Sequence, residues 1–203
     1  MGLHPPAERR RIFSGGLWMN FFGHLATISR HRWLVMKYCF RAGLYRQGLC
    51  HDLSKYSPEE FWTGVRFYQG NRSPNTAERE ANGYSLAWMH HKGRNRHHFE
   101  YWTDLSPETR IYEPVDMPVK YLCEMVADRI AACKTYQGAA YTDASPLQYL
   151  DRANESRLVH PQTMKRLRFL LVMLAEHGEE ETFRFMREVV LKGKSFAEES
   201  LAP

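Results

Sequence analysis

Apolar residues recur at the three- and four-residue spacing of α-helices along most of this chain. Residues 17–42 carry such a stripe and stop near Gly43, which predicts one long helix. Ser57-Pro58-Glu59-Glu60 is a capping box. It predicts a helix that ends at Gly70 and whose Glu60 reaches back to the helix start. The pattern predicts further helices over residues 76–91, 116–137, 160–178 and 179–192, and another that starts at Ser145.

Signals for β-strands are nearly absent, because no alternating stretch is bounded by turn residues. Asn82-Gly83 lies between segments of helical character, so we place it inside the helix over 76–91. The sequence therefore predicts an all-α fold with a single domain over residues 17–192. Residues 1–16 and 193–203 are expected to be flexible tails. The longest predicted loop, residues 102–116, lies between helices that carry histidines or acids, and such loops commonly border active sites.

Composition narrows the class of protein. The 203 residues are 43% hydrophobic and 25% charged, which is enough for a core and excludes a largely disordered chain. No stretch approaches about 18 uninterrupted apolar residues, so we expect no membrane span and no membrane partner. The four cysteines show no CxxC spacing. Buried free thiols in a reducing cytoplasm are the expected state.

The chain is basic, with 28 Lys and Arg against 23 Asp and Glu and a formal net charge of +5. Such a charge suits nucleic acid, a membrane surface or an anionic small substrate. The basic residues are scattered, and no run of five like charges occurs, which disfavours nucleic acid. An anionic small molecule is the expected partner, and a homo-oligomer remains open.

Candidate chemistry is concentrated in histidines and acids. Of ten histidines, four lie between residues 90 and 98. His31 shares a helix face with Ile28 and Val35, so we expect it to point inward. His24 lies seven residues earlier on that face and could enter the same pocket. The candidates, in chain order, are His31, His51, Asp52, His90, His91, His97, His98 and Asp128.

Asp128 is the candidate residue that most clearly needs a partner of opposite charge. It belongs to the predicted helix 116–137, which is apolar on most sides, so its carboxylate is expected to be buried. A buried carboxylate must be paired or must bind a metal ion, and the adjacent Arg129 diverges from it along the helix. A metal ion shared with inward histidines resolves this problem. Histidine and aspartate ligands suit Fe, Mn, Co, Ni or Zn.

The four histidines between residues 90 and 98 also have a plain interpretation. Together with Lys92, Arg94 and Arg96 they could form a solvated basic patch on the surface. The residues alone leave both interpretations open.

Four fragments carry a resemblance to a known superfamily. RHRWLVMKYC, GLCHDLSKYSPEEF, WMHHKGRNRHHFEYW and MPVKYLCEMVADRI span residues 30–130. Their order of histidines and aspartates resembles the HD-domain superfamily of metal-dependent phosphohydrolases, and more closely a little-characterised bacterial and phage family of HD-like proteins. The resemblance implies an all-α domain with a metal site between its central helices. The implied ligands are His31, His51, Asp52 and Asp128.

The histidine-rich segment resembles the extra histidines of HD proteins that bind two metal ions. His91 and His98 are the preferred pair for a second ion, and His90 and His97 are further candidates. Lys55 matches the lysine that follows the HD dyad in many members, which implies that it holds a phosphate.

The resulting expectation is a metal-dependent phosphohydrolase, with one or two ions, that acts on a phosphate ester such as a nucleotide. Asp52 would bind metal and orient the attacking water. Lys55 would offset phosphate charge together with Lys92, Arg94 and Arg96. Two alternatives remain: a di-iron oxygenase on the same fold, and a metal-stabilised module that binds its ligand without turnover.

Overall fold

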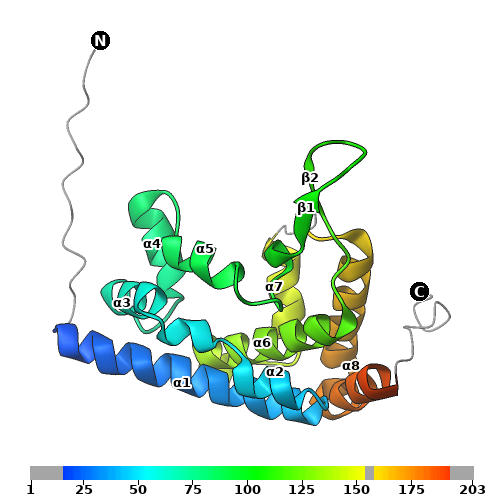
Figure 1. Ribbon diagram of the computed structural model, residues 1–203. Coiled ribbons are helices and arrows are strands. Elements are labelled where there is room, and N and C mark those ends of the chain that lie inside the picture. Colours follow the sequence, from blue (N-terminus) through cyan, green and yellow to red (C-terminus); the bar gives the residue numbers. More distant parts are fainter. Residues whose placement is uncertain (1–15, 154–157, 193–203) are drawn as a thin grey trace.

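Two long helices, α1 (Leu17–Arg41) and α6 (Val119–Gln137), pack against each other and form the frame of the molecule (Figure 1). The structure is a computed structural model that describes residues 16–153 and 158–192. The predicted all-α fold is confirmed, because the described residues form eight α-helices and a single small hairpin. The predicted tails, apart from Gly16, lie outside the described residues.

Both frame helices begin and end close to their predicted limits. The remaining elements follow in chain order and include three short 3-10 helices, labelled η. They are α2 (Tyr45–Cys50), η1 (Leu53–Tyr56), α3 (Pro58–Arg66), α4 (Pro74–Asn82), α5 (Leu86–Lys92), η2 (Phe99–Tyr101), β1 (Thr103–Leu105), β2 (Tyr112–Pro114), η3 (Gly138–Ala140), α7 (Ser145–Ala153) and α8 (Pro161–Lys192).

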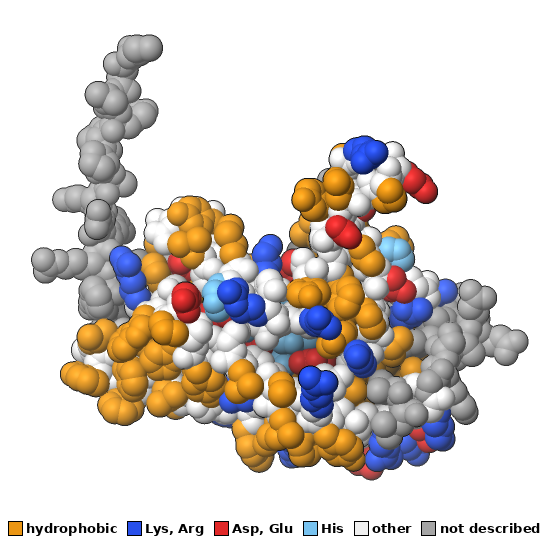
Figure 2. Space-filling view, in the orientation of Figure 1, with side chains coloured by type: hydrophobic (Ala, Val, Ile, Leu, Met, Phe, Trp, Pro, Cys, Tyr) orange, Lys and Arg blue, Asp and Glu red, His pale blue; other side chains and the backbone are white. Residues whose placement is uncertain are grey.

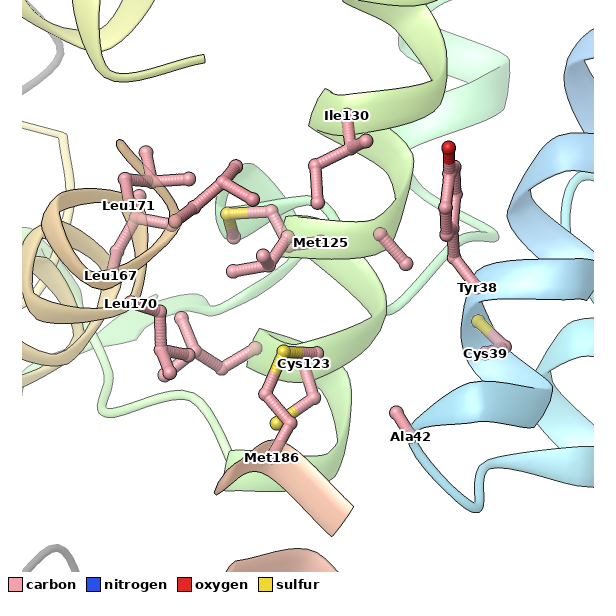
Figure 3. Packing of buried hydrophobic residues seen from close by; sticks show 14 of the residues in the cluster. Tyr38, Cys39, Ala42, Cys123, Met125, Ile130, Leu167, Leu170, Leu171 and Met186 are labelled. Carbon is pink, nitrogen blue, oxygen red and sulfur yellow. The ribbon is translucent and has the colours of Figure 1, made fainter. Parts of the chain in front are cut away.

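Helix α6 lies at the centre of the hydrophobic core. Its apolar side chains occupy most of its faces, so the helix gains from burial on several sides at once. Figure 3 shows Met125 and Ile130 of α6 between Leu171 of α8 and Tyr38 of α1. The prediction of a buried helix around Asp128 is therefore confirmed.

Helix α8 consists of two helical halves that meet at Gly178. The backbone there has φ 77° and ψ 178°, which a helix does not allow, and the two predicted helices 160–178 and 179–192 are confirmed. The second half turns back to the core, where Phe183 stacks on Tyr38 with ring centroids 5.1 Å apart. Glu179 secures the turn by accepting hydrogen bonds from Arg41 and from Lys134.

The predicted continuous helix over residues 76–91 is wrong. Gly83 adopts a left-handed conformation (φ 84°) that ends α4, and α5 begins three residues later. The buried carboxylate of Glu78 holds the turn by accepting hydrogen bonds from Ser85 Oγ and from the backbone N–H of Leu86. Because glycine has no Cβ, Gly83 adopts a positive φ without a steric clash, and the chain can turn here despite the helical pattern around it.

Helix α3 starts as predicted but differs at its end. Ser57 Oγ accepts from the backbone N–H of Glu60 at 3.4 Å, as a capping serine should. The carboxylate of Glu60 does not reach back to the helix start; it turns toward His90 and His91. The helix ends at Arg66, before the predicted Gly70.

The predicted loop 102–116 contains a short antiparallel hairpin, in which Thr103 pairs with Pro114 and Leu105 with Tyr112. The strands are three residues each, too short for an alternating pattern to be read in the sequence. Cys39, Cys123 and Cys133 are buried thiols, whereas Cys50 is exposed. Across residues 16–153 and 158–192, every helix falls short of the length and apolarity that a bilayer-spanning segment needs.

Candidate metal centre

Most of the histidines and acids singled out in the sequence meet beside α6, and they come from three helices and two connecting segments. His31 lies in the middle of α1, Asp128 lies on α6, and His91 lies near the end of α5. His51 and Asp52 occupy the junction between α2 and η1. Asp52 has a left-handed backbone (φ 52°), a costly conformation for a residue other than glycine, which turns its carboxylate inward at this junction.

One group of potential ligands consists of His31, His51, Asp52 and Asp128, whose ligand atoms all lie within 4.8 Å of one another. His31 Nε2 is 2.9 Å from Asp128 Oδ1, and His51 Nε2 is 3.3 Å from Asp52 Oδ2. The structure thus brings together the four residues that the resemblance implied as ligands of the first ion.

A second group consists of Asp52, His91, His97 and His98, again within 4.8 Å of one another. Asp52 Oδ1 lies 3.2 Å from His91 Nε2 and 3.4 Å from His97 Nε2. Two imidazoles of the histidine-rich segment therefore face one oxygen of the same carboxylate, and His98 completes the group. The preferred pair His91 and His98 is present, and His97 joins it.

Asp52 is shared by the two groups through different oxygens. Its Oδ2 faces His31 and His51, and its Oδ1 faces His91 and His97. A carboxylate in this position can bridge two cations, because each oxygen has lone pairs for a separate ion. Its side chain is only 1% exposed, so water cannot replace those partners.

Several atoms of these two groups are buried and make no hydrogen bond, which is uncommon for polar atoms in a folded protein. They are the Nε2 atoms of His31, His51, His97 and His98 and both carboxylate oxygens of Asp52, whose close contacts are ion pairs with one another, with Asp128 and with Lys55. Lone pairs that face one another without a proton or a cation between them are costly. The residues present therefore fit one or two divalent metal ions.

Two glutamates orient the imidazoles from behind. Glu124 Oε1 lies 3.0 Å from His51 Nδ1 and 3.2 Å from His97 Nδ1, and Glu60 Oε2 lies 2.7 Å from His91 Nδ1. An ionised carboxylate can only accept, so in each case Nδ1 carries a proton, and the neutral imidazole presents the lone pair of Nε2 to the group. Carboxylates behind metal-binding histidines commonly have this role.

The carboxylates of the cluster are ionised despite their burial. Burial alone would raise the pKa of Asp52, but the positive charges of His51 and Lys55 outweigh it and hold that pKa well below its ordinary value. The pKa of Asp128 is likewise well below its ordinary value, because its contacts with the imidazoles of His31 and His51 outweigh burial. Both side chains are thus in the form that binds metal.

The pKa values of the histidines are shifted in opposite directions, depending on the charges beside each imidazole. Burial lowers the pKa of His98 well below its ordinary value, and burial with the charge of Lys55 lowers that of His31, so both imidazoles are neutral. The pKa of His51 is raised well above its ordinary value, because the carboxylate of Asp52 outweighs burial. A proton on His51 balances this negative charge in the same place where a metal ion would.

A cavity of about 630 Å³ opens beside the two groups, a size typical of sites for small molecules. His31, His91, His97, His98 and Asp128 form part of its wall. The cations that line it are Lys55, Arg72, Arg79 and Arg129, and the rings that line it include Tyr68, Trp88, Tyr136 and Tyr149. Lys55 Nζ lies 2.6 Å from Asp52 Oδ2, between the cluster and the cavity.

The remaining predicted residues lie elsewhere. His90 is outside the two groups, with its Nδ1 2.6 Å from Glu60 Oε1. Lys92, Arg94 and Arg96 do not line the cavity, and their contact with a substrate phosphate stays a prediction. Arg94 donates to the carbonyl of His90, and Arg96 donates to Tyr121, so both long side chains are held on the outside by local partners.

The sequence missed the cavity arginines and the two orienting glutamates. Arg72 and Arg79 come from α4 and its preceding turn, far from the histidines in the sequence. Glu124 had a usable signal, because it precedes Asp128 by four residues and so lies on the same face of α6. The sequence predicts Glu60 only as part of the capping box of its own helix and does not predict its contact with His91.

Comparisons with known proteins add a family match. The model of a family described as "Family of unknown function (DUF5662)" matches residues 20–173, well over half of the chain. The matched region includes both candidate metal groups. No curated protein and no solved structure matches this chain.

Proposed function

This chain belongs to a family of unknown function, DUF5662, and we propose from its site that it hydrolyses a phosphate ester with bound divalent transition-metal ions. The observation that supports this proposal most is the position of Asp52, whose two oxygens face two separate groups of unpartnered imidazole nitrogens. The reaction class rests on the resemblance to HD-domain phosphohydrolases, which the family match leaves as a prediction.

His31, His51, Asp52 and Asp128 would hold one ion, and His91, His97 and His98 would hold a second with Asp52. A divalent ion supplies Lewis acidity, which polarises a phosphoryl oxygen and lowers the pKa of a coordinated water. Fe, Mn, Co, Ni and Zn all suit these ligands.

The chain itself would bind the phosphate through the cations of the cavity. Lys55 is half-buried, and the carboxylate of Asp52 raises its pKa despite burial, so it stays charged beside the cluster. Arg79 and Arg129 line the same cavity and offer planar donors to phosphate oxygens; Arg72 also lines it, and its guanidinium donates to Glu80 and Gln69. These arginines take the place of Lys92, Arg94 and Arg96 in the function expected from the sequence.

The aromatic and amide side chains of the cavity would hold the organic part of the ester. Tyr68, Trp88 and Tyr136 present rings, and Asn71 and Gln137 present amides that both donate and accept. This combination suits a planar polar group such as a nucleobase, so we propose a nucleotide as the substrate. The buried thiols are consistent with a cytoplasmic location.

The test is a hydrolysis assay on chain purified without chelator and without a histidine tag. We expect phosphate release from nucleoside monophosphates or from a chromogenic phosphate ester, and its loss in Asp52→Asn. His90→Gln is the matched control, since His90 lies beside the cluster but outside both groups. If metal-replete wild type releases phosphate from none of these esters, the proposed reaction is wrong.

A di-iron oxygenase is the second candidate, because the group with three histidines also suits iron. Loading with redox-inert Zn or Mn separates the two functions. Hydrolysis with either metal supports the hydrolase, whereas oxygen consumption that requires iron supports the oxygenase. A nucleotide that binds tightly and is never converted would indicate the binding module.

A further inference from the structure

The outer face of α1 carries exposed aromatic side chains along its whole length. Trp18, Phe22, Trp33 and Phe40 are 72%, 62%, 56% and 37% exposed. At about 100° per residue they fall within an arc of about 60°, opposite the face that holds His31. Figure 2 shows hydrophobic side chains along the lower edge of the molecule, over both ends of α1.

The same face continues into neighbouring elements. Met19 at the start of α1 and Trp62 of α3 are more than half exposed, as are Tyr45 and Leu49 of α2 at the other end. We call these side chains, with the four aromatic residues of α1, the outer face. An exposed apolar surface of this extent on a folded chain marks an interaction site.

On α1 and α2 the charge of the outer face has one sign, and the exposed Glu59 lies three residues before Trp62 on α3. Residues 17–50 contain no Asp or Glu. Arg30, Lys37 and Arg46 are exposed along it and form no ion pair with a described carboxylate. Lys37 Nζ lies 5.8 Å from the centre of the Trp33 ring, so cation and aromatic groups are interleaved. The partner that fits is apolar in its interior and negatively charged at its surface.

We propose that the outer face of α1 binds the surface of an anionic lipid membrane. The 25 residues of α1 span about 37 Å and can lie in the plane of the interface. Its indole and phenyl rings would enter the boundary between headgroups and acyl chains, and Arg30, Lys37 and Arg46 would meet the anionic headgroups. Such binding needs no spanning helix, so it is compatible with the absence of one among the described residues.

A second copy of the chain fits this face less well. Symmetric pairing would place Arg30, Lys37 and Arg46 of both copies at one interface whose helices α1 and α2 supply no carboxylate. An anionic membrane supplies the missing charge. The proposal is independent of the metal centre, because His31 occupies the opposite face of the same helix.

The experiment is cosedimentation of the full chain with vesicles. One set is phosphatidylcholine alone, and the other contains roughly 30% phosphatidylserine. We expect wild type to bind the anionic vesicles and to be released at about 0.5 M salt, where surface charges are screened. The variant with Arg30→Gln, Lys37→Gln and Arg46→Gln should bind them about 100-fold more weakly, at about fivefold for each cation. Trp18→Gln with Trp33→Gln should weaken binding at least about tenfold.

The matched control replaces three exposed cations on other helices by glutamine: Lys120 of α6, Arg152 of α7 and Lys165 of α8. It should bind as wild type does. All variants change exposed side chains, and melting temperatures equal to that of wild type would show that they fold. If wild type does not sediment with anionic vesicles, or if the control loses as much binding as the charge variant, the proposal is overturned. A dimer that Trp18→Gln and Trp33→Gln convert to a monomer, without vesicle binding, would assign the face to a second copy.

Discussion

Glu124→Gln should weaken both metal ions at once, because Glu124 contacts Nδ1 of a histidine in each group without belonging to either group of four ligands. Its Oε1 lies 3.0 Å from His51 Nδ1 and 3.2 Å from His97 Nδ1. Hydrogen bonding to these two histidines lowers the pKa of Glu124 despite its burial, so the interaction is charge-assisted. Glutamine keeps the shape and an acceptor oxygen but removes the charge that makes each imidazole a better donor of its lone pair.

The magnitude follows from the number of contacts. Loss of an orienting partner behind a metal ligand costs about 10- to 100-fold in metal affinity. Because glutamine can still accept, we expect about tenfold for each ion in Glu124→Gln, or about 1.4 kcal/mol each. Glu124→Ala leaves two buried Nδ1–H groups unpaired and should fall near the 100-fold end. Glu60→Gln should weaken only the ion beside His91, since Glu60 contacts neither His51 nor His97 in any described pair.

The assay is a titration of apo protein with Zn or Mn against a competing chelator, with stoichiometry from elemental analysis. Melting temperatures of the apo variants provide the control for folding. The reasoning fails if Glu124→Gln binds both ions as wild type does, or if it loses one ion and keeps the other unchanged. If wild type binds a third ion that Glu124→Gln alone loses, then Glu124, His51 and His97 form a metal site of their own.

Three further predictions concern ligands and packing. Asp52→Asn should lose both ions, whereas His31→Gln and His98→Gln should each lose one; elemental analysis that finds two ions in Asp52→Asn would refute the shared carboxylate. Gly64→Ala should destabilise the fold by about 2 kcal/mol, because a Cβ there would lie 2.1 Å from His24 Nε2 and force α1 from α3; an unchanged urea midpoint would contradict this. Burial lowers the pKa of His24 to about 4 from the ordinary value of about 6.5. Between these two pH values His24 is protonated in the unfolded chain but neutral in the folded chain. Stability should therefore fall as the pH drops from about 6.5 to 4, by about 3 kcal/mol in all, and His24→Gln should lessen this loss in apo protein unfolded by urea at several pH values.

The local pattern of apolar and polar residues predicted much of the candidate metal site. The apolar residues around Asp128 predicted a buried carboxylate, and its burial required a cation or a partner whatever the rest of the fold. His31 was expected to point inward because it shares a face with Ile28 and Val35, and it does. These inferences hold because they depend on one helix and on the cost of burying charge, which do not need the position of distant segments.

Other features depended on contacts between distant segments. The capping box correctly placed Ser57, but the carboxylate of Glu60 turned to His91, 31 residues away, because a buried imidazole offered it a partner. The break at Gly83 opposed the helical pattern and is held by the buried Glu78. Local propensity is a weak prior, and a buried polar group that needs a partner can override it.

The sequence by itself determined the helices of the frame, the turn at Gly178 and the residue types that can bind metal, because helix periodicity and side-chain chemistry are local properties. Only the tertiary structure decided that the two oxygens of Asp52 face different groups of histidines and that Arg72 and Arg79 line the cavity. It also decided that the aromatic outer face of α1 has no cover among the described residues. These are relations between side chains that are distant in the sequence, and they are set by how α1, α4 and α5 pack around α6.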